Sequence, residues 1–415
     1  MISVAIMGHG VVGSGVDEII RTHKERLFSA IGEELDVKYI LDLRDFPDSP
    51  HADRFTKDFE DIISDVEVRV VVEAMGGLNP AYDFTKRCLK AGKSVVTSNK
   101  ELVAQFGAEL LQIAKDNNAN YLFEASVGGG IPIIRPLSKC LAANEVDEIA
   151  GILNGTTNFI LTKMISEGMG FDEALKLAQE LGYAEKDPTA DVEGHDACRK
   201  ICILASLAYG KHVYPDNVHT EGISKITLED VKYAENWGGV IKLIGRCKVE
   251  SDGRMDIGVA PMFVPSKSQL ANINDVFNGI MVRGDCTGDV VFYGKGAGKL
   301  PTASAVVADV IDCALHLKRR KMIFWADSKE QNLLSKEESK SALYVRVNAE
   351  DKETAYNKVT EALGEVKVLT RENEPQNETA FATKAEVKYG EAMKALEALK
   401  AQGIEILSVL RIGNL

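Results

Sequence analysis

The sequence predicts an α/β protein of three successive units: a doubly wound parallel sheet, a mixed α/β unit and a C-terminal β-α-β-β-α-β unit. Three observations carry this prediction. Short apolar runs alternate with helical periodicity early in the chain, a glycine-rich turn joins the first run to a helix, and residues 343–415 repeat strand and helix patterns in a fixed order. A chain of 415 residues is long enough for two or three such units.

The first unit begins with an apolar strand over residues 2–7, a glycine turn and a helix with apolar positions on one face. Further strands are predicted at 37–43, 68–74, 93–97 and 121–127. Asn79 and Pro80 mark the start of one intervening helix, with Pro80 at its first position. Because strands that alternate with helices are joined by right-handed crossovers, the pattern predicts a parallel sheet covered by helices.

The pattern changes after about residue 128, where a second glycine-rich turn occurs. The elements predicted from there are a strand ending at Leu153, a polar loop at 154–158, helices around 159–182, a helix over about 191–209, strands flanking a turn at 251–253, and a helix over about 301–320. They predict a mixed α/β domain over 128–300, after which the last helix returns to the first unit.

The end of the chain predicts a linker and a small separate module. Residues 321–342 are rich in charge and weakly patterned, which is typical of a linker. Residues 343–415 follow the strand and helix order of a ferredoxin-like fold. A four-stranded sheet with helices on one face leaves an edge strand that pairs readily with a second copy, so at least a homodimer is expected.

Composition narrows the classes of partner and compartment. The chain has 49 Lys and Arg residues against 62 Asp and Glu residues, and a net charge of −13 repels phosphate backbones and anionic lipid. No apolar run approaches the roughly 18 residues that span a bilayer, and the N-terminus lacks the basic region of a signal peptide, so a cytoplasmic protein is expected. The seven cysteines are odd in number and contain no Cys-x-x-Cys pair, which argues against a disulfide framework or a zinc cluster.

The turn after the first strand has the spacing Gly8-x-Gly10-x-x-Gly13. Such glycines make the tight turn, let a pyrophosphate approach the backbone and let the helix pack on the strand, which predicts a dinucleotide site. An ordinary glycine-rich turn is the alternative. At the end of the second strand, Arg44 suits the 2′-phosphate of NADP and Asp42 suits the free ribose hydroxyl of NAD, so the choice of cofactor stays open.

A dense acidic segment leads into the long helix of the second unit. On that helix Asp196 and Lys200 lie one turn apart on one face, and Glu185 and Asp191 precede them. Such carboxylates suit a substrate amino group, and a lysine whose pKa is set by its surroundings suits proton transfer. The alternatives are a solvated charged helix face and, for His195, a metal ligand or a structural histidine.

A lysine also follows the strand predicted at 93–97. Residues Thr97 to Lys100 come directly after that strand. In an open parallel sheet, ligands bind beyond the carboxyl ends of the strands, so Lys100 is expected where cofactor and substrate meet. The alternative is a lysine that begins a helix and faces water.

Seven ordered motifs over about residues 1–320 make the chain resemble the homoserine dehydrogenase family, of the monofunctional bacterial type with a C-terminal ACT domain. The motifs are GHGVVGSG, VVEAMGG, TSNKELVA, EASVGGGIPII, GILNGTTNFIL, GYAEKDPTADVEGHDACRK and GKGAGKLPTASAVVADVID. The resemblance implies an NAD(P)-dependent oxidoreductase that interconverts L-homoserine and L-aspartate 4-semialdehyde in the aspartate pathway, which leads to threonine, methionine and isoleucine. Another amino-acid dehydrogenase of the same architecture and a catalytically silent nucleotide-binding regulator are the alternatives.

The resemblance also implies roles for individual residues. Lys100 and Lys200 are the implied catalytic lysines, with Asp196 supporting Lys200. The implied substrate contacts are Tyr183, Glu185, Asp191, Lys100 and Lys200. The implied cofactor contacts are Gly8, Gly10, Val11, Val12, Gly13, Arg44, Thr97, Lys100, Gly296 and Gly298. The implied site for a monovalent cation, usually Na+, consists of Glu124 and the backbone carbonyls of Val127, Gly129 and Ile131, and the irregular backbone there suits such an oxygen-seeking ion.

The implied domains are a Rossmann-type NAD(P)-binding domain over 1–127 with the helix at about 301–320, a substrate-binding, catalytic and dimerisation domain over 128–300, the linker over 321–342, and an ACT-like regulatory domain over 343–415. The first loop of the ACT-like domain lacks the Pro-Gly that usually opens its helix. It carries Glu350, Asp351 and Glu353, whose charges repel the carboxylate of an amino-acid effector such as threonine. We expect a dimer or tetramer in which threonine inhibits weakly or not at all.

Overall fold

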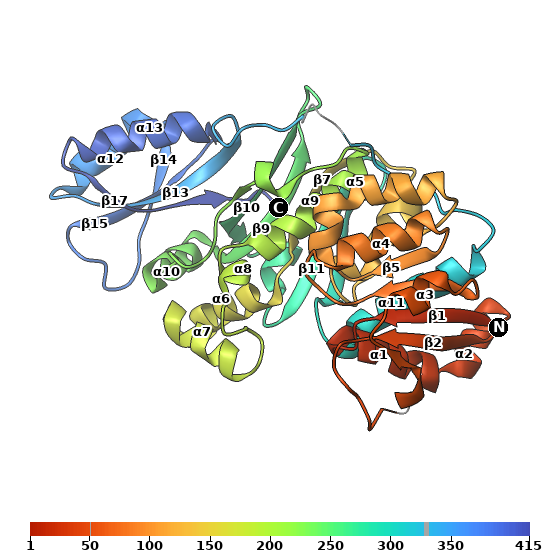
Figure 1. Ribbon diagram of the computed structural model, residues 1–415. Helices are drawn as coiled ribbons and strands as arrows, with labels where there is room; N and C mark the ends of the chain where they lie inside the picture. Colours follow the sequence, from red (N-terminus) through yellow and green to blue (C-terminus); the bar gives the residue numbers. More distant parts are fainter. Residues whose placement is uncertain (50, 328–331) are drawn as a thin grey trace.

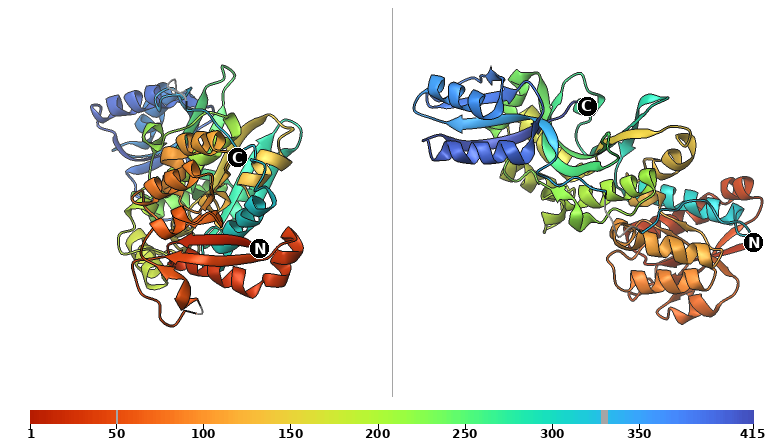
Figure 2. Two further views of the ribbon diagram at one scale, coloured as in Figure 1. Left: turned by 45° about the vertical axis from the view of Figure 1, so that its right-hand side comes forward. Right: turned by 90° about the horizontal axis from the view of Figure 1, so that it is seen from above.

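The structure is a computed structural model that describes residues 1–49, 51–327 and 332–415. Three units follow one another through an elongated molecule, with the N-terminal sheet at one end and the C-terminal strands at the other (Figure 1). The right-hand view of Figure 2 shows the same separation from above. Residues 328–331 of the predicted linker lie outside the described residues. Within the described ranges, no helix is both long and apolar enough to cross a membrane.

The N-terminal unit is a parallel sheet in the order β3-β2-β1-β4-β5-β6, which confirms the predicted doubly wound, Rossmann-type architecture. Its strands are β1 (Ile2–Met7), β2 (Leu35–Leu41), β3 (Phe55–Thr56), β4 (Val68–Glu73), β5 (Ser94–Thr97) and β6 (Tyr121–Leu122). Every pairing between these strands is parallel. The apolar residues of β1 and β4 are buried, as expected for strands covered on both faces.

Helices cover this sheet on both sides. They are α1 (Val11–Thr22), α2 (Lys24–Ile31), α3 (Glu60–Ser64), α4 (Ala81–Lys90), α5 (Lys100–Asp116) and α11 (Lys299–Leu315). Pro80 lies just before α4 rather than at its first position. α11 returns from late in the sequence and packs along α1, where Gly15 leaves the necessary room: a Cβ at this glycine would lie 2.9 Å from the Cβ of Ala303.

The strand predicted over 121–127 is wrong beyond Leu122, because the chain turns inward there. The carboxylate of Glu124 accepts hydrogen bonds from the backbone N–H groups of residues 133–135, at 2.6, 2.8 and 2.8 Å. Asp309 of α11 in turn accepts a hydrogen bond of 2.7 Å from the N–H of Glu124. These hydrogen bonds hold the backbone in a turn that leaves the sheet, at the point where the central unit begins.

The central unit is an antiparallel sheet in the order β12-β11-β7-β9-β10, with the short strand β8 beside β10. Its strands are β7 (Val146–Ile152), β8 (His219–Thr220), β9 (Gly239–Val249), β10 (Met255–Pro265), β11 (Phe277–Gly284) and β12 (Gly288–Lys295). Its helices are α6 (Gly155–Glu167), α7 (Phe171–Glu180), α8 (Thr189–Val192), α9 (His195–Tyr209) and α10 (Leu228–Trp237). The single helix predicted over 191–209 is two helices, because Gly194 between them has a φ of +82°.

The C-terminal unit has the predicted β-α-β-β-α-β order, with helices on one face of its strands (Figure 1). Its elements are β13 (Lys340–Asn348), α12 (Lys352–Leu363), β14 (Val366–Leu369), β15 (Glu378–Thr383), the short β16 (Val387–Lys388), α13 (Tyr389–Lys400) and β17 (Glu405–Ile412). β17 pairs in parallel with β10, Met262 with Arg411 and Phe263 with Ile412, so the central and C-terminal strands form one continuous sheet. The sequence pattern does not indicate this junction.

A buried ionic network fixes the C-terminal unit to α10. Arg346 of β13 donates to Asp230 of α10 and to Glu378 of β15, both at 3.1 Å. The hydroxyl of Tyr344 donates to Asp230 at 2.9 Å. Asp230 is fully buried, so loss of its partners would leave an uncompensated charge in the core. The tail is therefore built into the body of the protein.

The described part of the linker packs on the body as well. Trp325 is 1% exposed and donates from its indole N–H to Nδ1 of His212 at 2.8 Å. Its ring lies against Gly107 of α5, where a Cβ would be only 2.6 Å away. A buried tryptophan anchors this segment, which the charge-rich sequence around it does not suggest.

Candidate active site

The candidate site lies where the carboxyl ends of β4 and β5 face the first turn of α9. Asn99 caps α5, since its side-chain oxygen accepts a 3.0 Å hydrogen bond from the N–H of Leu102. Lys100 is consequently the first residue of α5. Asp196 lies in the first turn of α9, and Lys200 follows one turn later, as the helical spacing predicts.

A buried carboxylate holds two lysines from different units. One oxygen of Asp196 lies 2.6 Å from Nζ of Lys100, and the other lies 2.7 Å from Nζ of Lys200. Lys200 also donates to the carbonyl of Leu153 at 2.7 Å. The side chain of Asp196 is only 4% exposed and that of Lys200 only 10%. This arrangement excludes the alternative of a solvated charged helix face for these two residues.

Asn154 connects this cluster to a second carboxylate. Its side-chain amide donates to Asp191 at 2.7 Å and to Asp196 at 2.8 Å. Its side-chain oxygen accepts from the N–H of Thr157 and caps α6, which therefore begins at Gly155. No role for Asn154 was predicted from the sequence, although an asparagine that precedes a helix is a recognisable capping signal.

The two lysines have pKa values shifted in opposite directions. Burial lowers the pKa of Lys200 below its ordinary value. Partial burial acts in the same way on Lys100, but the Asp196 carboxylate beside it outweighs burial and raises the pKa of Lys100. Burial would raise the pKa of Asp196, yet the two lysines hold it well below the usual range, so this carboxylate stays charged. Lys200 is thus the lysine that releases a proton more readily.

The remaining implied substrate contacts lie at the rim of this cluster. Burial, together with the charge of Asp196, raises the pKa of Asp191. Tyr183 and Glu185 lie in an exposed loop, where the carbonyl of Tyr183 accepts a 2.6 Å hydrogen bond from the hydroxyl of Thr156. Among the described residues, the Glu185 carboxylate has no hydrogen-bond or ion-pair partner. The structure therefore brings Lys100, Lys200, Asp196 and Asp191 together and leaves Tyr183 and Glu185 outside the hydrogen-bonded cluster.

The glycine turn has the geometry that a dinucleotide requires. Gly8 has a φ of +95°, and a Cβ there would lie 2.8 Å from the carbonyl oxygen of Ala74. A Cβ on Gly13 would lie 1.9 Å from the carbonyl oxygen of Gly8, whereas Gly10 faces open space. The turn leads directly into α1, which begins with Val11 and Val12. Tight turn, open approach and close helix packing are the three features that a pyrophosphate site needs.

Asp42 and Arg44 form an ion pair just beyond β2. The backbone N–H and Nε of Arg44 donate to one oxygen of Asp42 at 3.0 Å, and Nη2 donates to the other at 2.9 Å. The N–H of His9 in the glycine turn also donates to Asp42, at 2.8 Å. Hydrogen bonding by Arg44 holds the pKa of Asp42 far below its usual range. The Arg44 side chain is 63% exposed, so it remains accessible to a ligand.

Thr97 has a structural role that the sequence does not reveal. Its buried hydroxyl donates to Glu73 at 2.6 Å and accepts from the N–H of Asn99 at 2.8 Å. Glu73, at the end of β4, also accepts from the N–H of Met75 at 2.8 Å, and burial raises its pKa. Asn99 donates to the carbonyl of Gly77 at 2.6 Å. Glu73 and Asn99 thus fix the two loops at the carboxyl end of the sheet, and neither was singled out from the sequence.

Several buried backbone carbonyls follow Glu124 in the chain. The carbonyls of Val127, Gly129 and Ile131 belong to buried residues and accept no hydrogen bond from any part of the chain that the structure describes. A Cβ on Gly129 would lie 2.4 Å from the carbonyl oxygen of Gly296, so the two glycine-rich turns touch. Unpaired buried carbonyls are oxygen ligands that a hard monovalent cation can take, whereas both oxygens of the Glu124 carboxylate already accept hydrogen bonds from residues 133–135.

Gly298 and His195 complete the placement of the predicted residues. Gly298 has a φ of +127° and immediately precedes α11. His195 is exposed at the start of α9. Across the described ranges, no three His, Cys, Asp or Glu side chains are grouped to hold a metal ion, so His195 has no support as a metal ligand.

Known proteins are similar to this chain in sequence and in fold. A family model described as homoserine dehydrogenase matches residues 132–311, and one described as homoserine dehydrogenase, NAD binding domain, matches residues 8–124. The chain is similar to homoserine dehydrogenase from Bacillus subtilis, with 38% identity over 370 residues, 88% of this chain and 85% of that protein. A solved homoserine dehydrogenase from Thiobacillus denitrificans has a TM-score of 0.88 at 32% identity, over 99% of this chain and 98% of that chain. A hyperthermophilic archaeal homoserine dehydrogenase in complex with NADPH has a TM-score of 0.64 at 31% identity, over 76% of this chain and 98% of that chain.

Proposed function

Because the chain belongs to the homoserine dehydrogenase family, we propose that Lys100, Asp196 and Lys200 carry out the proton transfer of its reaction. That reaction is the NAD(P)-dependent interconversion of L-homoserine and L-aspartate 4-semialdehyde in the aspartate pathway. Family membership sets aside the two alternatives, a different amino-acid dehydrogenase and a silent regulator. The single observation that carries the proposal is the buried Asp196 carboxylate, which holds one lysine from each of two units.

Lys200 is the residue that we assign to move the proton. The cofactor, when bound, supplies the hydride for the aldehyde carbon. Nζ of Lys200 then donates a proton to the oxygen that becomes the homoserine hydroxyl, and the lysine is reprotonated from solvent. In the oxidative direction the neutral amine accepts that proton. Burial lowers the pKa of Lys200, which favours both steps near neutral pH.

Lys100 and Asp196 hold the substrate oxygen and the proton donor in place. The raised pKa of Lys100 keeps it charged, so it supplies a fixed positive charge next to the reacting oxygen. Asp196 orients both amines through ion pairs of 2.6 and 2.7 Å. Asn154 fixes Asp196 in turn, at 2.8 Å. Asp196 and Asn154 act as positioning residues in this scheme.

The substrate ammonium is assigned to the carboxylates at the rim. Asp191 is tied to the cluster through Asn154 and faces the same region as Lys100 and Lys200, whose charges act on it. Glu185 and Tyr183 sit on the exposed loop that precedes α8, from which they reach the substrate when it is bound. Carboxylates paired with an ammonium group would select an amino-acid substrate over a simple aldehyde.

For the cofactor, Arg44 favours NADP over NAD. Its side chain is 63% exposed just beyond β2. Its guanidinium donates two hydrogen bonds to the Asp42 carboxylate, and a 2′-phosphate can accept the same bidentate pair. Asp42 is already satisfied by Arg44 and by the N–H of His9, which leaves it poorly suited to a ribose hydroxyl. The similar archaeal enzyme is in complex with NADPH. Gly8, Gly10 and Gly13 are assigned to the pyrophosphate.

The buried carbonyls of Val127, Gly129 and Ile131, with the carboxylate of Glu124, are assigned to a sodium ion. These oxygens would hold the ion, and its positive charge would compensate the negative charge of the buried Glu124 carboxylate. The turn at Gly129, which would hold the ion, packs directly on the turn at Gly296.

The C-terminal ACT-like domain is assigned a role in forming the oligomer. Asp351 caps α12 through bonds from the N–H groups of Glu353 and Thr354, so the amides that would hold an effector carboxylate are already occupied. We assign the domain division stated above, a dimer or tetramer formed partly through the ACT-like domain, a cytoplasmic location, and weak or absent inhibition by threonine.

A spectrophotometric assay tests the proposed function. Purified protein is given L-homoserine with NAD and with NADP in separate reactions, and formation of the reduced cofactor is followed. We expect reduction that depends on homoserine, with a lower KM for NADP. No reduction with either cofactor, from protein that still binds NADPH, would overturn the assignment of the cluster.

A further inference from the structure

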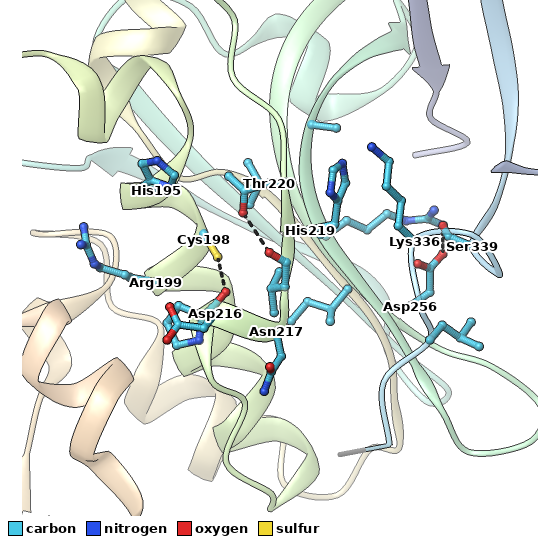
Figure 3. Close-up of a pocket in the computed structure, with 18 of the residues that line it drawn as sticks. His195, Cys198, Arg199, Asp216, Asn217, His219, Thr220, Asp256, Lys336 and Ser339 are labelled. Carbon is cyan, nitrogen blue, oxygen red and sulfur yellow. Dashed lines mark hydrogen bonds between the residues drawn. The ribbon is translucent and has the colours of Figure 1, made fainter. Parts of the chain in front are cut away.

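A cavity of about 690 Å³ lies beside α9, and none of the proposed substrate contacts line it. Its walls come from α5 and α9, from the loop that leads into β8, from β10, from the linker and from β17 (Figure 3). All three units of the chain therefore meet around it. Its contact with α9 is made by His195, Cys198 and Arg199. A volume of this size is typical of small-molecule sites.

Two opposite charges in this cavity are joined through one hydroxyl group instead of by a direct ion pair. Nη1 of Arg411 donates to the hydroxyl of Ser339 at 2.8 Å, and this hydroxyl donates to Asp256 at 3.0 Å. Figure 3 shows Ser339 and Asp256 pointing toward each other. Neither Arg411 nor Asp256 forms an ion pair within the ranges that the structure describes. A cation and an anion thus lie on either side of one hydroxyl.

The other cations of the cavity wall are already paired. Arg199 lies 3.3 Å from Glu101, Lys336 lies 3.2 Å from Glu221, and Arg246 pairs with the buried Glu148. The unpaired state of Arg411 is therefore a local feature and not a general property of the wall.

Other buried or oriented side chains surround these two charges at the same end of the cavity. Ser341 lines the cavity and is 6% exposed, and its hydroxyl has no hydrogen-bond partner among the described residues. A buried polar group of this kind is normally satisfied by water or a ligand. The guanidinium of Arg411 lies 4.5 Å from the centre of the Tyr389 ring, which limits its orientations. Ser339 is buried as well, at 3% exposure.

We propose that this cavity binds a small zwitterion of the α-amino-acid class. The carboxylate pairs with Arg411, whose planar guanidinium matches carboxylate geometry. The ammonium pairs with Asp256, and the free hydroxyl of Ser341 bonds to the ligand. An α-amino acid carries its two charges on adjacent carbon atoms, which suits charged groups separated by one bridging hydroxyl. The site is distinct from the α12 N-terminus, whose amides Asp351 occupies.

A ligand in this cavity would contact α9, the helix that carries Asp196 and Lys200, through other residues of that helix. Arg199 immediately precedes Lys200 and pairs with Glu101, which immediately follows Lys100. Asp256 on β10 and Arg411 on β17 belong to the two strands that join the central and C-terminal parts of the sheet. A ligand that bridges them would stabilise this junction, so binding is expected to raise the melting temperature of the full chain.

The test is a calorimetric titration of the full-length protein with each proteinogenic L-amino acid and with L-homoserine. For the best ligand, the amide and the N-acetyl derivative are titrated too. We expect at least one amino acid to bind in the Asp191→Asn variant, where the substrate site is impaired, and both derivatives to bind at least about tenfold more weakly.

Variants of the cavity complete this test. Asp256→Asn, Arg411→Gln and the milder Ser339→Ala are expected to weaken binding by about tenfold or more, while Asn217→Ala, a change on the cavity wall away from the charged groups, leaves it unchanged. Turnover of homoserine in each variant shows that the protein is folded. Absence of any amino-acid binding in Asp191→Asn, or unchanged binding in Asp256→Asn and Ser339→Ala, would overturn the proposal without affecting the proposed function.

Discussion

Replacement of Asp196 by asparagine tests how strongly one carboxylate controls the two lysines. The substitution keeps the shape of the side chain and removes the charge that lies 2.6 Å from Lys100 and 2.7 Å from Lys200. A hydrogen bond to a charged group is worth about 1.5–3 kcal/mol. Because the charge of Asp196 opposes the effect of burial on Lys200, its removal should lower the pKa of Lys200 further.

The sign of this shift gives a clear kinetic expectation. Aldehyde reduction needs protonated Lys200, so activity is lost as the pH rises through the pKa of this lysine. In Asp196→Asn the loss should occur at lower pH, and turnover at neutral pH should fall roughly 10²- to 10³-fold, within the range of a positioned proton-transfer group.

The assay is the initial rate of aldehyde reduction from pH 6 to 10, roughly, at saturating NADPH. Asp187→Asn is the matched control, because Asp187 is an exposed acid of the same segment whose carboxylate accepts hydrogen bonds from Thr189 alone among the described residues. A high-pH limb at its wild-type position, with turnover within about threefold of wild type, would refute the assignment of Asp196.

The remaining predictions concern the cofactor, the tail and the break before α9. Arg44→Ala should weaken NADPH binding by about 1.5–3 kcal/mol and leave NADH nearly unaffected; equal losses, measured by fluorescence titration, would show that Arg44 does not contact the 2′-phosphate. Titration of the full chain with millimolar L-threonine should leave turnover nearly unchanged, because Asp351 occupies the amides of α12, and strong inhibition would contradict this. Gly194→Ala should destabilise the protein by about 1–2 kcal/mol, because the φ of +82° is unfavourable for alanine, and an unchanged thermal unfolding curve would argue against strain at this position.

Local patterns predicted most of the fold and the one-turn pairing of Asp196 with Lys200. The glycine spacing at 8–13 and the one-turn register of Asp196 with Lys200 depend only on neighbouring residues, so the sequence was enough. The contact between Lys100 and Asp196 joins residues far apart in the chain and depends on how two units pack. The motifs contain all three residues, but only the structure shows that Lys100 and Lys200 share the Asp196 carboxylate.

The features that the sequence did not predict are tertiary. Strand β6 ends early because the carboxylate of Glu124 accepts hydrogen bonds from the N–H groups of residues 133–135. The strand propensity of residues 121–127 contains no information about these contacts. β17 pairs with β10 through only two residue pairs, so the sequence of neither strand indicates that the two strands pair. Trp325 lies in a charge-rich segment, and the average composition of that segment does not indicate that a buried tryptophan anchors it.

The turnover of Lys200→Ala at saturating homoserine and NADP tests the assigned proton transfer most directly, with the NADPH dissociation constant measured on the same preparation. Lys200 is buried beside Asp196 and the carbonyl of Leu153, and it contacts no part of the glycine turn. Turnover should therefore fall roughly 10²- to 10⁴-fold while NADPH binds as in the wild type. A variant that keeps more than about a third of wild-type turnover would remove Lys200 from the proton transfer and contradict the account.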